Sequence, residues 1–193
     1  MTELTTKALD AATWPDFAQL VEANNGVWGG CWCMWYHDKA ARKADPTDRR
    51  AAKQCRVEEG RAHAALVFDG AACVGWCQFG SPQELPHLHN ERAYVAGATT
   101  LPDWRITCFF SGKGYRRKGV ATTALGGALA QIAARGGGTV EGYPEDIEGR
   151  KASAAFLFNG ALSTFERHGF ERQRLIGKHK WVVVKQVENA ATA

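Results

Sequence analysis

The sequence contains no apolar run that approaches the roughly 18 residues of a membrane-spanning helix. Its first residues, MTELTTK, include no apolar segment of the kind that forms the core of a secretory signal. An excess of one charge is also lacking, because 24 Lys and Arg residues face 20 Asp and Glu residues, for a net charge of +4. We therefore expect a cytoplasmic protein that needs neither a membrane nor a nucleic acid as its partner.

The six cysteines lack the paired C-x2-C spacing that is typical of structural zinc sites. Cys31 and Cys33 form only a C-x-C pair with His37 nearby, so we predict no metal site. In a protein without a secretory signal, cysteines are expected to stay reduced. Several of them should therefore act as small core residues.

The balance of residue types is that of an ordinary globular protein. The chain has 193 residues, of which 45% are hydrophobic and 23% charged, enough for one sizeable core. It shows no internal repeat and no linker-like tract. We predict a single domain over residues 1–188 and a disordered C-terminal tail over 189–193. The oligomeric state stays open, with a homodimer as one alternative.

The first part of the chain predicts a strand over residues 5–9 and two helices. The first helix should begin after Thr13, whose hydroxyl is expected to cap it, and run to about residue 23. The second should follow Asp45, end at Gly60 and lie on the surface. Its narrow apolar stripe is expected to comprise Ala52, Cys55 and Val57.

Between these helices lies an unusual aromatic segment, VWGGCWCMWYH, at residues 27–37. Large aromatic side chains are usually buried, so the segment could be a hydrophobic plug in the core. Alternatively it could form the wall of a substrate pocket, together with the long polar loop expected over residues 81–103. The candidate pocket residues are Trp32, Cys33, Trp35 and Glu91.

The rest of the chain predicts a sheet of mixed direction with helices packed on it. Two β-rich runs flank Asp69-Gly70, a strong hairpin signal. A β-loop-α-β unit at residues 104–143 should place its two strands in parallel. We expect strands over 62–68, 72–79, 104–110, 139–143, 171–176 and 179–187, and helices from Val120 to the glycines at 136–138 and over 153–167.

The loop GKGYRRKG between the strand at 104–110 and its helix concentrates four cations where the helix begins. The positive end of a helix and its free N–H groups favour a bound phosphate. A P-loop would need Lys and Ser or Thr directly after Gly119, where Val120 and Ala121 stand instead. A dinucleotide-binding loop would need a different glycine spacing after Gly112 and Gly114. The sequence therefore predicts a phosphorylated ligand held by another type of loop.

The run RRKGVA at residues 116–121 resembles the R/Q-x-x-G-x-G/A signature of the GCN5-related N-acetyltransferase (GNAT) family. The hairpin ending in Val74-Gly75-Trp76 and the late segment FERHGF at 165–170 are similar to further family segments in the same order. The resemblance covers roughly residues 62–187. It implies a mixed, mostly antiparallel sheet with a splayed central parallel pair, and acetyl-CoA as the cofactor.

The resemblance also implies which residues hold acetyl-CoA. The loop would bind the pyrophosphate, and the pantetheine arm would lie between the splayed strands. Gly119 has no side chain and Ala121 only a methyl group, so the backbone N–H groups there are accessible to phosphate oxygens. The cofactor-binding candidates are Cys108, Phe109, Phe110, Arg116, Arg117, Lys118, Gly119, Val120, Ala121, Thr122, Asn159 and Phe165.

The catalytic groups are not those the resemblance would supply. Arg105 stands where many members have a glutamate base, and Phe165 stands where they have a tyrosine acid. Glu141 and Tyr143 share one face of the second central strand, because side chains alternate along a strand. We predict that Glu141 acts as the base and Tyr143 as the acid.

These residues lead to one preferred function and two alternatives. The preferred function is acetyl transfer from acetyl-CoA to a primary amine of a small molecule, by direct attack of the amine. One alternative is a CoA-binding regulatory or sensor module without turnover, because the usual catalytic residues are replaced. The other is a protein N-acetyltransferase, although the crowded aromatic residues favour a small pocket.

Overall fold

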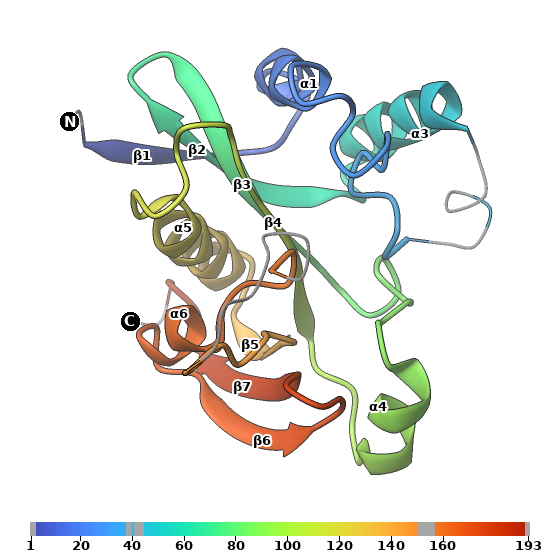
Figure 1. Ribbon diagram of the computed structural model, residues 1–193, viewed down its shortest axis with the longest axis vertical. Helices are drawn as coiled ribbons and strands as arrows, with labels where there is room; N and C mark the ends of the chain where they lie inside the picture. Colours follow the sequence, from blue (N-terminus) through green and yellow to red (C-terminus); the bar gives the residue numbers. More distant parts are fainter. Residues whose placement is uncertain (1–2, 38–39, 41–44, 150–156, 192–193) are drawn as a thin grey trace.

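Figure 1 shows the computed structural model, which describes residues 3–37, 40, 45–149 and 157–191. Within these residues a seven-stranded sheet has the order β1-β2-β3-β4-β5-β7-β6. Neighbouring strands are antiparallel except for β4 and β5, which are parallel, so the predicted mixed sheet is confirmed. The strands are β1 (Leu4–Ala8), β2 (His63–Asp69), β3 (Ala72–Gly80), β4 (Trp104–Ser111), β5 (Gly138–Gly142), β6 (Glu171–Leu175) and β7 (Trp181–Val187).

Helices cover both faces of the sheet, and each face has its own hydrophobic cluster. One cluster joins α1 and the aromatic segment 27–37 to Trp76 and Cys108 of the sheet. The other joins α5 and α6 to the opposite face. Figure 1 shows α5 on one side of β4, and α1 and α3 on the other. The helices described are α1 (Trp14–Glu22), α3 (Pro46–Glu58), α4 (Glu91–Gly97), α5 (Val120–Ala134) and α6 (Leu162–Glu166).

Two segments differ from the predicted secondary structure. The expected loop 81–103 contains the short helix α4, whose one buried side chain, Tyr94, was too little apolar signal to predict it. The expected helix 153–167 begins only at Leu162. Gly160 has a positive φ of 83°, which interrupts a helix, and residues 153–156 lie outside the described part of the chain.

The turn before α1 is organised by Asp10 rather than by the predicted cap. The Thr13 side chain makes no capping bond, and its hydroxyl donates instead to the Ala8 carbonyl at 2.7 Å. The Asp10 carboxylate accepts the N–H groups of Ala12 and Thr13, each at 2.9 Å. The prediction placed the helix correctly and its cap wrongly, because a hydroxyl can also bond backward to the preceding chain.

The buried side of α3 is also different from the predicted stripe. Val57 is buried as expected, but Cys55 is exposed and Lys53 takes the inner position with only 1% of its surface exposed. The Lys53 ammonium donates to the side-chain oxygen of Gln78 on β3, at 2.7 Å. A hydrogen bond to a neutral amide thus accommodates a charge that patterning would place in solvent.

Candidate active site

Strand β4, the loop at 112–119, helix α5 and strand β5 form the predicted β-loop-α-β unit. The Gly112 N–H donates to the Val74 carbonyl at 2.8 Å, which anchors the start of the loop to β3. A side chain at Gly75 would lie 2.5 Å from the Phe110 carbonyl oxygen, so glycine permits β3 to approach β4 there. These contacts fix the end of β4 and hence the position of the loop.

The loop presents its cations around the N-terminus of α5. Gly119 precedes the helix with a φ of +86°, a conformation that glycine adopts without strain. The side chains of Lys113, Arg116, Arg117 and Lys118 are all exposed. No acidic residue lies in the first turn of α5, so the positive end of the helix adds to the charge of the loop. This arrangement can bind an anion.

A cavity of about 400 Å³ opens beside this loop. It brings together residues of the segment that follows α1, the end of β4 and the cationic loop. Trp28, 46% exposed, contributes an aromatic wall that the pocket prediction did not include. The lining residues are Asn24, Val27, Trp28, Phe110, Ser111, Lys113, Gly114 and Arg116.

The two central strands separate soon after they pair. The register joins Trp104 to Val140, Arg105 to Glu141 and Ile106 to Gly142, after which β5 ends while β4 continues. The chain at 158–162 enters the resulting wedge. The Phe109 N–H donates to the Phe158 carbonyl at 2.7 Å, and the Glu145 N–H donates to the Gly160 carbonyl at 3.0 Å.

Glu141 lies where the strands are still paired and is the centre of a buried hydrogen-bond network. Its carboxylate oxygen Oε2 accepts the phenol O–H of Tyr94 at 2.8 Å and that of Tyr143 at 2.9 Å. Only 6% of the Glu141 surface is exposed. Burial, together with this carboxylate, holds the pKa of both tyrosines above its usual value, so both phenols keep their protons at neutral pH.

Two arginines flank the Tyr94 ring of this network, Arg105 and Arg174. Arg105 lies opposite Glu141 in the register, and its guanidinium carbon is 5.4 Å from the centre of the Tyr94 ring. One of its N–H groups donates to the Leu85 carbonyl at 2.8 Å. Arg105, where the sequence resemblance would place a glutamate, thus lies against Tyr94 of the Glu141 network.

Glu141 and Tyr143, which the sequence paired on one strand face, are hydrogen-bonded, and their catalytic roles stay a prediction. Tyr94 was not expected beside them, because α4 was not predicted.

The predicted cofactor residues fall into two groups. Phe110 and Arg116 line the cavity, and Arg117, Lys118, Gly119, Ala121 and Thr122 lie at or next to the N-terminus of α5. The remaining predicted residues are buried against other parts of the protein. These are Cys108, next to Cys33; Phe109 and Phe165, in the cluster under α5; Val120, in the same cluster; and Asn159.

Asn159 occupies the wedge between the separated strands. Its side-chain N–H groups donate to the Tyr36 hydroxyl, at 2.6 Å, and to the Thr107 carbonyl. Its side-chain oxygen accepts the Lys180 ammonium at 2.9 Å, and Lys180 pairs with Glu145 at 3.6 Å. Asn159 therefore holds β4 to the chain beyond β5.

The four predicted pocket residues are not brought together. Trp32 packs in the core against Trp14, with ring centres 6.0 Å apart, and Cys33 is buried beside Trp76. Trp35 is half-buried and stacks on His89 at 3.7 Å. Glu91 is exposed in the first turn of α4. Most of the aromatic segment is therefore core, as the plug interpretation held, and Trp28 is its residue at the cavity.

The described residues also bear on a metal site and on a membrane span. No group of three or more His, Cys, Asp or Glu side chains among them could hold a metal ion. No helix in the described ranges is long and apolar enough to cross a membrane.

Solved structures with the same architecture cover nearly the whole chain. A GNAT-family acetyltransferase from Streptococcus pneumoniae has a TM-score of 0.54 and 14% identity, over 96% of this chain and 99% of that one. The PaiA N-acetyltransferase from Thermoplasma acidophilum, solved with coenzyme A, has a TM-score of 0.53 and 12% identity, over 96% and 99%. A ribosomal-protein alanine N-acetyltransferase from Escherichia coli has a TM-score of 0.51 and 10% identity, over 97% and 96%.

These likenesses define the class of fold: the chain shares its architecture with solved acetyltransferases. The particular fold is that of the GNAT family, as the sequence resemblance predicted. No protein-family model and no curated protein sequence matches the chain.

Proposed function

We propose that this protein is an N-acetyltransferase that uses acetyl-CoA to acetylate a primary amine of a small molecule. The observation that carries the proposal is the cationic loop at the N-terminus of α5, beside a cavity of about 400 Å³ at the end of β4. The fold shared with acetyltransferases, one of them solved with coenzyme A, supports it.

The residues at this loop suit the phosphates of coenzyme A. Arg116 and Lys113 line the cavity with positive charge, while Gly119 leaves the start of α5 uncovered. Phe110 and Trp28 would provide apolar walls for the arm that carries the acetyl group. When bound, acetyl-CoA would supply that group as a thioester.

Glu141 and Tyr143 are the proposed proton-transfer pair. Glu141 would take a proton from the amine, directly or through water, and the protonated phenol of Tyr143 could donate one. Glu141 lies opposite Arg105 of β4. Arg105 precedes the cavity residue Phe110 by five residues, a distance of roughly 16 Å along an extended strand. The arm would therefore have to run along β4 to connect the cavity with this pair.

One contact favours the second candidate, a CoA-binding module without turnover. The Phe109 N–H, at the open edge of β4, is already bonded to the Phe158 carbonyl at 2.7 Å. An arm that bonds to the same edge must displace that carbonyl or use other groups. If the segment stays in place, the cofactor could bind at the loop without its acetyl group reaching Glu141.

Turnover measurements distinguish the two candidates. Free coenzyme A would be measured after mixing the protein with acetyl-CoA and a panel of small amines, with a lysine-containing peptide for the protein-acceptor alternative. Glu141→Gln should lower kcat by a factor on the order of 100 or more, whereas Glu171→Gln, an exposed control on β6, should leave it unchanged. Binding of acetyl-CoA without turnover on any amine would favour the second candidate and contradict the first.

A further inference from the structure

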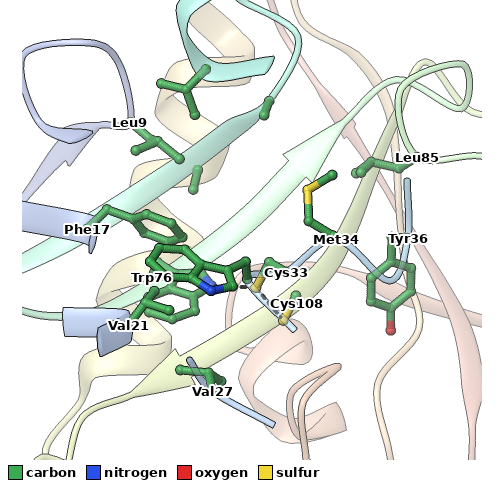
Figure 2. Close-up of a cluster of buried hydrophobic side chains, with 14 of the residues drawn as sticks. Leu9, Phe17, Val21, Val27, Cys33, Met34, Tyr36, Trp76, Leu85 and Cys108 are labelled. Atoms are coloured by element: carbon green, nitrogen blue, oxygen red, sulfur yellow. Dashed lines mark hydrogen bonds between the residues drawn. The ribbon is translucent and has the colours of Figure 1, made fainter. Parts of the chain in front are cut away.

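Two cysteines that the proposed function does not use lie in direct contact in the core. The Sγ atoms of Cys33 and Cys108 are 3.1 Å apart, although 75 residues separate them in the sequence. Cys33 belongs to the aromatic segment 27–37, and Cys108 belongs to β4. Figure 2 shows the two sulfur atoms facing each other beside Trp76. Both cysteines are free thiols in this structure.

The surroundings favour the thiolate form of Cys33. The Trp76 indole N–H donates to the Cys33 sulfur at 3.1 Å. Burial alone would raise the pKa of Cys33, but the Cys108 thiol, the Lys53 ammonium and the Trp76 indole together hold it below its usual value. The hydrogen bond to Cys33 and burial raise the pKa of Cys108, which therefore keeps its proton. Cys33 is therefore suited to react as a nucleophilic thiolate, and Cys108 as a protonated thiol.

The backbone around Cys33 is strained. Trp32 and Cys33 have φ values of 51° and 55°, in the left-handed region that non-glycine residues rarely adopt. Val27 and Trp28, earlier in the same segment, also have positive φ values. Packing must hold the segment in this conformation, because each such residue stores backbone strain. A strained segment needs less energy to open locally, which gives a small oxidant a route to the buried pair.

We propose that Cys33 and Cys108 form an oxidation site that a hydroperoxide converts into a disulfide. The Cys33 thiolate attacks the peroxide oxygen and becomes a sulfenic acid, and the peroxide leaves as an alcohol or water. The Cys108 thiol then attacks the Cys33 sulfur, and one water molecule is released. In total, two thiols and one hydroperoxide give a disulfide, water and the reduced peroxide.

The product links the aromatic segment to the central strand. To form the bond, the sulfur atoms must move about 1 Å closer than their present 3.1 Å. The disulfide would fix Cys33 of this segment to β4 at Cys108, two residues before Phe110, which lines the cavity. It would also close a long loop in the unfolded chain, so the oxidised protein should be more stable than the reduced one.

Peptide mapping tests the site in the full-length protein. Purified reduced protein is treated with hydrogen peroxide, free thiols are alkylated under denaturing conditions, and the digest is analysed by mass spectrometry. We expect a 33–108 cross-linked peptide that a dithiol reductant removes. The midpoint of thermal unfolding should rise by about 5 °C or more on oxidation and return on reduction. The proposal would be overturned if Cys33 and Cys108 were both recovered in the alkylated form while the exposed Cys55 was oxidised.

Cysteine variants separate this site from other cysteine chemistry. Cys108→Ser should leave Cys33 oxidised only to the sulfenic acid, which a dimedone-type probe traps, and should abolish the thermal shift. Cys73→Ser, a half-buried control on β3, should form the cross-link as the wild type does. A cross-link that persists in Cys108→Ser through another cysteine would contradict the assignment. The peptide map of the oxidised wild-type protein tests the proposal without any variant, so a variant that fails to fold leaves the test intact.

Discussion

Gly126 and Gly127 are neighbours on α5, yet replacing each with alanine should change stability in opposite directions. A methyl group at Gly126 would meet only the His168 ring at 3.5 Å, an ordinary contact. Alanine is favoured over glycine in a helix by about 1 kcal/mol, so Gly126→Ala should stabilise the protein by about that amount. A methyl group at Gly127 would lie 2.8–2.9 Å from three side-chain atoms of Thr6 on β1.

The cost at Gly127 is that of overpacking, typically about 1–3 kcal/mol. After the helix preference is subtracted, Gly127→Ala should be destabilising by roughly 0–2 kcal/mol. The two variants should therefore differ by about 1–3 kcal/mol in free energy of unfolding. Urea denaturation measures this difference, and both variants should show the same dependence of that free energy on urea concentration. Equal stabilities, or a more stable Gly127→Ala, would refute the close approach of α5 to β1.

Substitutions at three further positions test other parts of the structure. Burial and the Lys53 charge hold the pKa of His37 well below its ordinary 6.5, so the unfolded chain binds a proton first as the pH falls. The free energy of unfolding of the wild type should then fall by up to about 1.4 kcal/mol per pH unit below about pH 6.5. His37→Gln should reduce this dependence on pH, measured by urea denaturation at several pH values. An unchanged dependence would contradict the role of His37. Asp45 accepts the N–H groups of Thr47 and Asp48 at the start of α3, so Asp45→Ala should cost about 1 kcal/mol while Asp45→Asn keeps most of the stability. Tyr94→Phe removes one buried hydrogen bond to a carboxylate and should lower the free energy of unfolding by about 1–3 kcal/mol in the same assay; no loss would show that the phenol contributes nothing.

The central unit of the fold was predictable because strong local signals coincide there. Asp69-Gly70 marks the hairpin turn, and the apolar face of residues 120–132 repeats with the period of a helix. The crossover rule then fixes β4 and β5 as parallel neighbours. The division into a domain over 1–188 and a tail over 189–193 stays a prediction.

The missed features depend on contacts between distant residues. The charged sequence of α3 predicts that Lys53 lies on the surface. Its burial is explained only by its hydrogen bond to Gln78 on β3. Tyr94 reaches Glu141 across 47 residues, and Cys33 reaches Cys108 across 75. Local patterning contains no signal for such pairs. The cationic loop at 112–119 could be predicted because its four cations lie close together in the sequence, whereas the cavity wall formed by Trp28 required the folded structure.

Calorimetric titration with acetyl-CoA tests the central claim most directly. We expect one binding site, with Arg116→Ala weakening the affinity by roughly 10- to 100-fold, the loss of one charge-assisted phosphate contact. Lys178→Ala removes an exposed positive charge outside the loop and should bind as the wild type does. No binding of acetyl-CoA by the folded wild type, or equal losses in the two variants, would contradict an acetyl-CoA site at the loop of residues 112–119.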